Sequence, residues 1–181
     1  MLQKSFAVAG FLLLGSTANA AQLDFTAGVL SAGDTVLTMP EAVATAASGT
    51  TLAVGDFVAN ALCPLGTSGC NGEMTLTWNV DVQNVSFDYG FGDDGDVATL
   101  TMFDSLMNVV GTTTLNSESG IAAADLSTFG VFRTIVFDNT AATGAGYAYG
   151  DVTYTAVPVP AAAPLLLGGL AGLGLLRRRS S

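Results

Sequence analysis

Carboxylates and one pair of cysteines are the side chains of this sequence with the clearest capacity for chemistry. Four aspartates, Asp88, Asp93, Asp94 and Asp96, lie at or near one glycine-rich turn. Calcium takes about six to eight oxygen ligands, which an acidic turn could supply from side chains and carbonyl groups together. Aspartate and glycine are also what tight hairpin turns require, and the spacing is not that of an EF-hand loop. Calcium at these four aspartates is therefore one hypothesis and a plain turn is the other.

Carboxylates elsewhere raise the question of catalysis. Asp138 with Asn139, and Asp151, follow or interrupt predicted strands in a similar way. Paired carboxylates could serve a small glycoside hydrolase as acid and base, but such an enzyme usually needs aromatic platforms in a cleft. Trp78 lies in an alternating segment and is expected in the core. The chain has no histidine, which excludes Ser-His-Asp and Cys-His nucleophiles and histidine-rich zinc sites. We expect no enzyme and no cofactor other than calcium.

The two cysteines, Cys63 and Cys70, bound a short loop. A pair at this spacing in a chain bound for an oxidising compartment predicts a disulfide, which the chain-entropy model credits with about 2.5 kcal/mol of stability. A redox-active pair is the alternative. It usually shows two residues between the cysteines and a nearby cation, and this loop has neither.

The charge distribution separates the middle of the chain from its ends. Residues 21–156 carry all fifteen acidic residues and only one cation, Arg133, for a net charge of −14. Such a surface repels polyanions and offers no basic patch for phosphates, so nucleic-acid binding is excluded. Solubility or calcium binding explains the acidic excess.

The first 20 residues have the form of a secretory signal peptide. Lys4 supplies the positive region, residues 6–15 form an apolar core, and residues 18–20 read Ala-Asn-Ala, a small-residue cleavage site. A permanent anchor is the alternative, although the apolar core is shorter than the roughly 20 residues of a spanning helix. We therefore predict export from the cytoplasm.

The C-terminal end has three parts in a fixed order. The first part is a motif, Val157, Pro158, Val159, Pro160 and Ala161. The second is an apolar run over residues 162–176, and the third is the basic cluster Arg177, Arg178 and Arg179. The prolines favour an extended entry. The apolar run predicts a short transmembrane helix, and the arginines hold its end in the cytoplasm.

This arrangement resembles the PEP-CTERM class of bacterial sorting signals, most closely its VPLPA-CTERM variant. The resemblance covers residues 157–179, with Val159 where the variant usually has Leu. It implies recognition by an exosortase-type membrane transpeptidase, removal of the tail, and transfer from the inner membrane to the cell surface or extracellular matrix. A simple membrane anchor that is never processed is the alternative.

The middle of the chain shows the period-two alternation of β-strands. The predicted strands span residues 23–25, 35–39, 50–54, 75–80, 85–91, 97–103, 109–115, 131–137 and 147–155. Residues 104–108 are predicted as a hairpin loop, residues 150–151 as a bulge, residues 42–51 as an exposed loop, and residues 120–126 as a site for one helical turn. These elements predict an all-β fold, a two-sheet β-sandwich or jelly roll.

Three segments follow from these patterns: a signal peptide over residues 1–20, an acidic β-sandwich ectodomain over residues 21–156, and a sorting signal over residues 157–181. Residues 75–155 also resemble the jelly-roll ectodomains often found ahead of such tails, which implies a carbohydrate-binding-like fold. We expect a non-catalytic structural or adhesive protein of the cell surface or matrix, with exopolysaccharide as a partner. A calcium-dependent carbohydrate-binding module is the alternative.

Overall fold

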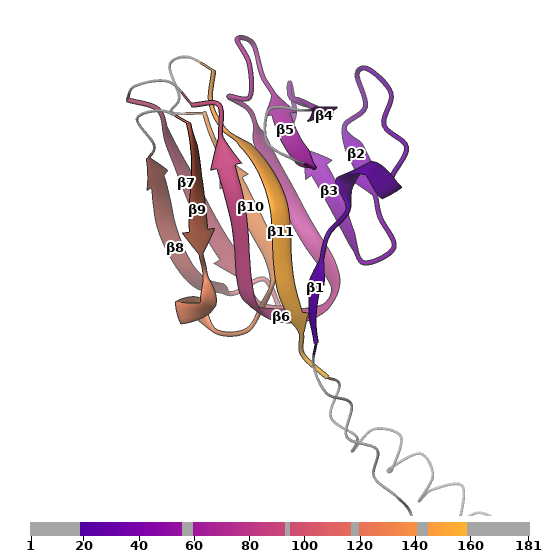
Figure 1. Ribbon diagram of the computed structural model, residues 1–181, viewed down its shortest axis with the longest axis vertical. Coiled ribbons are helices and arrows are strands. Elements are labelled where there is room, and N and C mark those ends of the chain that lie inside the picture. Colours follow the sequence, from indigo (N-terminus) through magenta and orange to yellow (C-terminus); the bar gives the residue numbers. More distant parts are fainter. Residues whose placement is uncertain (1–18, 56–59, 93–94, 117–119, 141–144, 159–181) are drawn as a thin grey trace, which may run out of the picture.

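The computed structural model describes residues 19–55, 60–92, 95–116, 120–140 and 145–158, which fold into strands and two short 3-10 helices (Figure 1). The elements are β1 Ala20–Gln22, η1 Phe25–Ala27, β2 Val36–Thr38, β3 Ala42–Ala46, β4 Thr51–Gly55, β5 Ala61–Leu65, β6 Glu73–Gly90, β7 Val97–Phe103, β8 Val109–Asn116, β9 Ile121–Asp125, η2 Ser127–Phe129, β10 Phe132–Asp138 and β11 Ala148–Ala156. The fold is all-β, as predicted. Within these residues no helix is long and apolar enough to cross a membrane.

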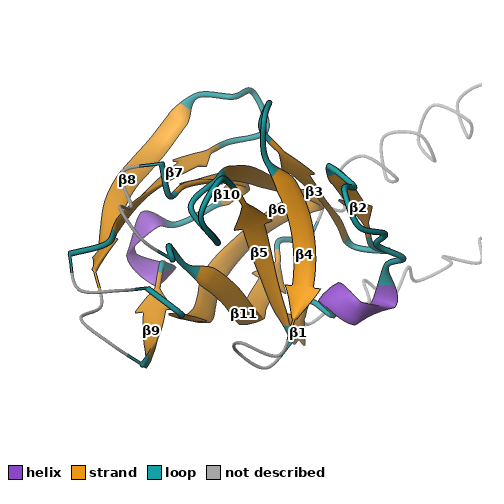
Figure 2. Cartoon of the chain, turned by 90° about the horizontal axis from the view of Figure 1, so that it is seen from above, coloured by secondary structure: helices purple, strands orange, loops and turns teal. Residues whose placement is uncertain are grey.

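The strands divide into two layers (Figure 2). The first sheet has the order β2-β3-β6-β10-β7-β8, and every pair in it is antiparallel. The second sheet has the order β4-β5-β11-β6-β9, with β1 also paired to β11. This pairing confirms the prediction of a β-sandwich.

Strand β6 belongs to both layers. Its first part pairs with β3 and β10 in the first sheet, and its part from Val82 onward pairs with β11 and β9 in the second. The strand turns a corner between the two, where Asn84 has a φ of 52° and the register against β10 shifts. The sequence predicted two separate strands here. The alternation of residues 75–80 and 85–91 predicts that Val80 and Phe91, at the ends of these segments, face inward. They are instead 37% and 45% exposed, because the corner and a positive φ at Phe91 break the alternation.

The core lies between the layers and is rich in aromatic rings. Trp78 is 1% exposed and contacts Phe132 and Tyr154, with ring centroids 6.2 Å and 5.8 Å away. Phe87 packs edge-on against Phe137 and Tyr149. Such ring pairs each add about 0.5–1.5 kcal/mol beyond the burial of apolar area. The predicted burial of Trp78 is confirmed, and this indole cannot serve as a platform for a ligand.

Three local predictions were wrong. Residues 42–51 were expected to form an exposed loop, but β3 lies there and buries Ala42, Ala44 and Ala46 against β6. Residues 120–126 form β9 rather than a helical turn, and Phe25 begins η1 rather than ending a strand. Alanine is a poor strand former by propensity, and pairing with a central strand overrides that weak preference. Strand β5 was not predicted.

Two predicted irregularities are confirmed. Residues 104–108 connect β7 to β8, and the carboxylate of Asp104 accepts from the backbone nitrogens of Leu106 and Asn108 at 2.8 Å and 2.9 Å. In β11 the register against β6 shifts between Gly150 and Thr153, and Asp151 has a φ of 45°. Both irregularities lie where a short polar side chain can hydrogen-bond to the backbone or where a glycine tolerates unusual backbone dihedral angles.

The two ends of the described domain lie at the same end of the sandwich (Figure 1). Ala20 pairs with Thr155, and the backbone nitrogen of Val157 donates to the oxygen of Asp81 at the β6 corner, 2.8 Å away. We call this end, with the β6 corner and the loop of residues 104–108, the terminal pole. The opposite end, with residues 66–71 and 145–147, is the loop pole.

Candidate functional site

Part of the outer side of the first sheet carries an uncharged array made mainly of threonine and valine, bordered by Glu73 and Asp138 in the next row on the same side. Strand pairing aligns its outward side chains in two rows across six strands. One row is Val36, Thr45, Thr75, Val136, Thr101 and Thr112, and the other is Thr38, Val43, Thr77, Thr134, Phe103 and Val109. We call these twelve residues the threonine–valine face.

The array is regular because strands lie about 4.8 Å apart and alternate residues about 6.7 Å apart along each strand. Thr45 and Thr112 are exposed, Thr75 and Thr101 are half-buried, and Thr134 lies deeper at 3% exposed. The hydroxyls of Thr77 and Thr134 are 3.2 Å apart. The face therefore presents hydroxyls, which donate and accept, beside methyl groups, which offer apolar contact.

The sequence analysis missed this face although a signal for it was present. Three strands of the first sheet contain Thr-x-Thr, at Thr75 and Thr77, at residues 99 and 101, and at residues 112 and 114. Period-two spacing places both threonines of each pair on one side of the sheet. The sequence pattern does not reveal the order of the strands in the sheet, and it is this order that brings the threonine pairs side by side.

The loop pole is held together by one disulfide and a buried amide. Cys63 and Cys70 form the predicted disulfide, with Cα atoms 5.2 Å apart, and both are buried. The side-chain amide of Asn139 donates to the oxygens of Cys70 and Tyr147 at 2.6 Å and 2.9 Å, and it accepts from the hydroxyl of Tyr149. Burial raises the pKa of Tyr149 well above its ordinary value. Asn139 is thus a structural residue and not an exposed ligand.

Of the four aspartates predicted to bind calcium, the two that the structure describes, Asp88 and Asp96, have separate surroundings. Asp96 is 1% exposed, and its carboxylate accepts from the backbone nitrogen of Gly146 at 3.0 Å. Asp88 alternates with the buried Phe87 and Tyr89, so it faces outward from the second sheet. Asp93 and Asp94 lie outside the described residues. Among the described side chains, no group of three or more acidic, histidine or cysteine residues could hold a metal ion.

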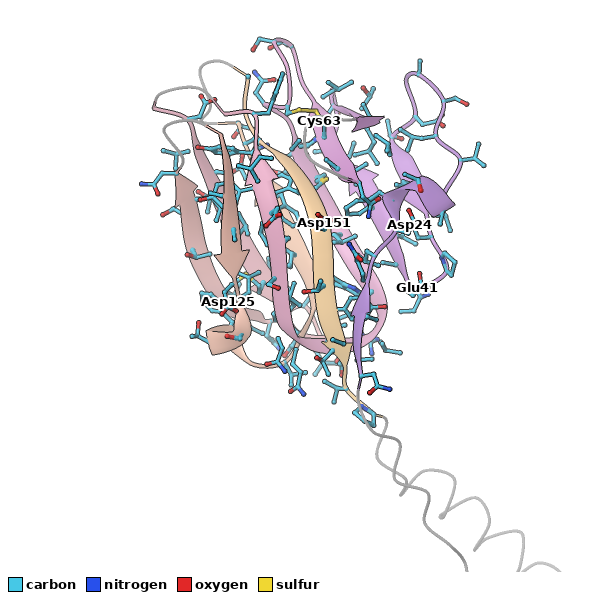
Figure 3. All side chains as sticks on the ribbon, viewed as in Figure 1. Asp24, Glu41, Cys63, Asp125 and Asp151 are labelled. Carbon is cyan, nitrogen blue, oxygen red and sulfur yellow. A yellow bond between two sulfur atoms is a disulfide. The ribbon has the colours of Figure 1, made fainter. Side chains whose placement is uncertain are left out.

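Most described aspartates have local structural partners, and Figure 3 shows the labelled acids at separate places on the domain. Aspartates 24, 34, 104, 125 and 138 each accept from a backbone nitrogen in a nearby turn. Asp81 pairs with Arg133 at 2.9 Å, and Asp151 accepts from the side chain of Gln22 at 2.8 Å. Hydrogen bonds lower the pKa of Asp24, Asp104 and Asp125. The acidic excess therefore serves turns as well as solubility.

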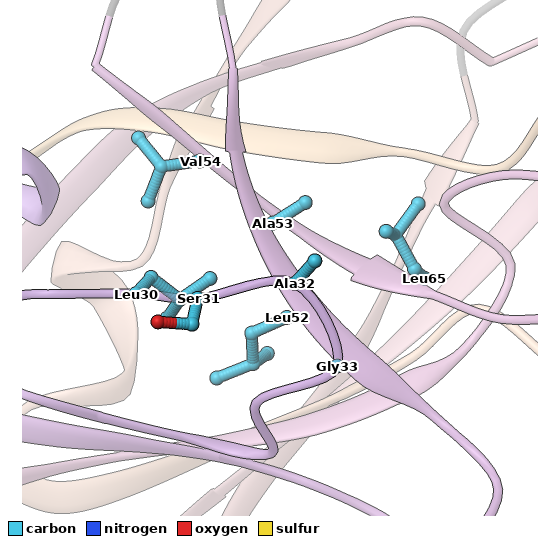
Figure 4. A pocket seen from close by; sticks show the side chains of 8 residues that line it. All are labelled: Leu30, Ser31, Ala32, Gly33, Leu52, Ala53, Val54 and Leu65. Atoms are coloured by element: carbon cyan, nitrogen blue, oxygen red, sulfur yellow. The ribbon is translucent and has the colours of Figure 1, made fainter.

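A shallow pocket of about 280 Å³ lies beside β4 (Figure 4). Its lining is Leu30, Ser31, Ala32, Gly33, Leu52, Ala53, Val54 and Leu65. This lining contains one hydroxyl and no titratable group, so it offers neither an acid nor a base. The pocket has no capacity for hydrolysis.

The predicted sorting motif begins at the last residues of the domain. Val157 is tied to the terminal pole through its bond to Asp81, and Pro158, which is exposed, has no N–H to continue a sheet. The described residues do not include the rest of the motif, Val159, Pro160 and Ala161, or the basic cluster Arg177, Arg178 and Arg179. They also do not include residues 1–18 of the predicted signal peptide. The domain and the motif are therefore contiguous, without a spacer between them.

No protein-family model matches the chain, and no curated protein matches it. Among solved structures, the chain is similar to a point mutant of CBM29-2, a family 29 carbohydrate-binding module, with 13% identity and a TM-score of 0.49, over 76% of this chain and 91% of that one. It is also similar to a Streptococcus pneumoniae fucose binding module, with 13% identity and a TM-score of 0.37, over 64% of this chain and 70% of that one. The sandwich described above rests on strand pairing in the chain itself.

Proposed function

We propose that this protein is an exported, non-catalytic adhesive component of the cell surface or extracellular matrix that binds neutral polysaccharide through the threonine–valine face. The observation that carries the proposal is a patch of twelve uncharged positions, with Glu73 and Asp138 at its border, in a domain whose net charge is −14. An uncharged face on an acidic domain selects an uncharged partner, because an anionic polymer is repelled by the rest of the surface.

The chemistry of the face suits a sugar chain. Threonine hydroxyls can exchange hydrogen bonds with sugar hydroxyls, and the methyl groups of threonine and valine can pack on the apolar sides of the rings. The large aromatic side chains that would give tight binding at one site are in the core, as Trp78, Tyr147 and Tyr149 show. Binding by each sugar unit is therefore weak, and affinity comes from many units of one long polymer engaging six strands.

Export and sorting complete the proposal. The signal-like N-terminus and the tail with its exosortase-type motif direct the chain through the inner membrane and then to the surface. The disulfide between Cys63 and Cys70 supports an oxidising destination. The adjacent ends of the domain support delivery from a membrane, because both predicted processing sites lie at the terminal pole.

The adhesive face is tested by charge substitution. Thr101→Glu places a charge within the face, on β7, and Thr155→Glu places the same charge on β11 of the second sheet as a matched half-buried control. We expect Thr101→Glu to weaken binding to the neutral polysaccharide of the protein's own cells about tenfold, the equivalent of ~1.4 kcal/mol, in affinity electrophoresis. Equal binding by both variants and the parent protein would exclude the face.

Sorting is tested by intact-mass analysis of protein from the membrane, surface and medium fractions of its own cells. We expect the surface form to lack residues 1–20 and everything beyond the motif at residues 157–161. A mature form that retains residues 164–179 in the membrane fraction would replace sorting with simple anchoring.

A further inference from the structure

The terminal pole carries a cluster of exposed apolar side chains. The loop between β7 and β8 and the first residue of β8 expose Leu106, Met107 and Val109 at 80%, 61% and 61%. Val80 at the β6 corner and Val131 before β10 are exposed at 37% and 43%. We call these five residues the apolar tip. They are half of the ten large apolar side chains that the described part of the chain exposes.

The loop that carries Leu106 and Met107 of the tip is held by hydrogen bonds. Asp104 accepts from the backbone nitrogens of Leu106 and Asn108 and from the side chain of Asn108, at 2.8 to 2.9 Å. Met107 adopts a φ of 63°, where glycine or asparagine is the residue that costs least. A bulky apolar side chain is thus held outward at a position whose backbone favours a small or polar one.

The tip lies at the end of the domain from which the tail leaves. Val80 precedes Asp81, whose oxygen accepts from the nitrogen of Val157, and Val131 precedes Phe132, which pairs with Val82 at the same corner. Strands β7 and β10 run antiparallel with Phe103 opposite Thr134, so the loop after Phe103 also lies at this pole (Figure 1).

The length of chain beyond the domain sets how far this pole can stand from a membrane. Only four residues separate Val157, still bonded to the domain, from Ala162, the first residue of the apolar run. The five residue-to-residue steps from Val157 to Ala162 span at most about 17 Å when the chain is fully extended. While the apolar run is in a bilayer, the terminal pole is therefore held against the bilayer surface.

We propose that the apolar tip rests in the interfacial zone of a zwitterionic lipid surface while the tail holds the protein in the membrane. The charge of Asp81 is offset by Arg133, but the carboxylates of Asp104 and of the exposed Glu41 are not paired with a cation in any described ion pair. These carboxylates would be repelled by an anionic surface, so the acids near the tip favour a zwitterionic one. The inference rests on the export and tethering part of the proposed function.

The test uses the full chain in phosphatidylcholine vesicles with and without brominated acyl chains, which quench tryptophan by contact. Trp78 is the single tryptophan and is buried, so it gives a constant background. Leu106→Trp reports on the tip. Ile121→Trp, 62% exposed at the start of β9 and at the opposite pole, is the matched control. Unchanged thermal unfolding shows that both variants fold.

We expect the emission of Leu106→Trp to shift to shorter wavelength and to be quenched by brominated lipid, and that of Ile121→Trp to match the parent protein. Flotation with the vesicles but equal quenching of both variants would overturn the inference and leave the tethering intact. A blue shift of Leu106→Trp without quenching would assign the tip to a second copy of the chain instead. Failure to float would overturn the tethering, and this inference with it.

Discussion

Asn139 donates its side-chain amide to the backbone oxygen of Cys70, 69 residues earlier in the chain, across 2.6 Å. The same amide group bonds Tyr147 and accepts from Tyr149, so one fully buried side chain joins the disulfide loop to the entrance of β11. The three segments that meet at the loop pole are thereby fixed to one another.

Asn139→Ala is expected to lower the free energy of unfolding by about 3 kcal/mol, because it removes the acceptor of the Tyr149 hydroxyl and the side-chain donor to the backbone oxygens of Cys70 and Tyr147. Asn79→Ala is the control. The Asn79 amide donates to the oxygen of Pro40 in an exposed setting, and its loss should cost about 0.5 kcal/mol. Urea denaturation measures both, and similar losses in the two variants would contradict the role of Asn139.

Gly146→Ala is expected to be far more damaging than Gly95→Ala. Both glycines have positive φ, 66° and 88°, so an alanine is strained by its backbone at either position, and at residue 95 no less than at residue 146. A Cβ at residue 146 would lie 2.3 Å from the backbone oxygen of Cys70, whereas no described atom lies within 4 Å of one at residue 95. Gly146→Ala should melt several degrees below Gly95→Ala. Equal melting temperatures would contradict the prediction and show that the loop pole accommodates the added Cβ at little cost.

Stability should fall in acid through the capped turns. Hydrogen bonds, first from the Asn108 side chain, lower the pKa of Asp104, so the unfolded chain takes up the proton first as the pH falls. The contribution is present above the unfolded pKa of about 3.9 and is lost as the pH drops through the lower folded value. Asp104→Asn should therefore destabilise the protein more at about pH 7 than at about pH 3 in urea denaturation. An equal effect at both values would refute this linkage.

Calcium at the acidic turn stays a prediction with a direct test. Because Asp96 is engaged by Gly146 and Asp88 faces outward, we expect the same melting temperature in calcium and in chelator. A clear rise in calcium, removed by Asp93→Asn or Asp96→Asn, would instead establish the calcium-dependent module.

The sequence predicted those features that depend on local chemistry. Alternation around Trp78 placed it in the core, the spacing of Cys63 and Cys70 predicted their disulfide, and a shift in the pattern near Asp151 predicted the bulge in β11. Each depends on neighbours a few residues apart, where the period of a strand or the closure of a short loop determines the geometry.

Features that depend on distant partners could not be read in this way. The alanines of β3 form a strand only because β6 lies beside them, and β6 changes sheets at a corner that its own alternation does not mark. Asn139 resembled an exposed turn residue until its partners at Cys70 and Tyr149 were known. The threonine–valine face likewise required the order of six strands.

Strand β6 has a consequence for how the domain could form during export. Its second half completes the second sheet only by pairing with β11, whose last residue, Ala156, immediately precedes the predicted sorting motif. If the chain is exported from its N-terminus as proposed, β11 is delivered last, and the sandwich could close only when the apolar run reaches the bilayer. Completion of folding would then coincide with arrival of the tail, and the processing enzyme would receive a finished domain.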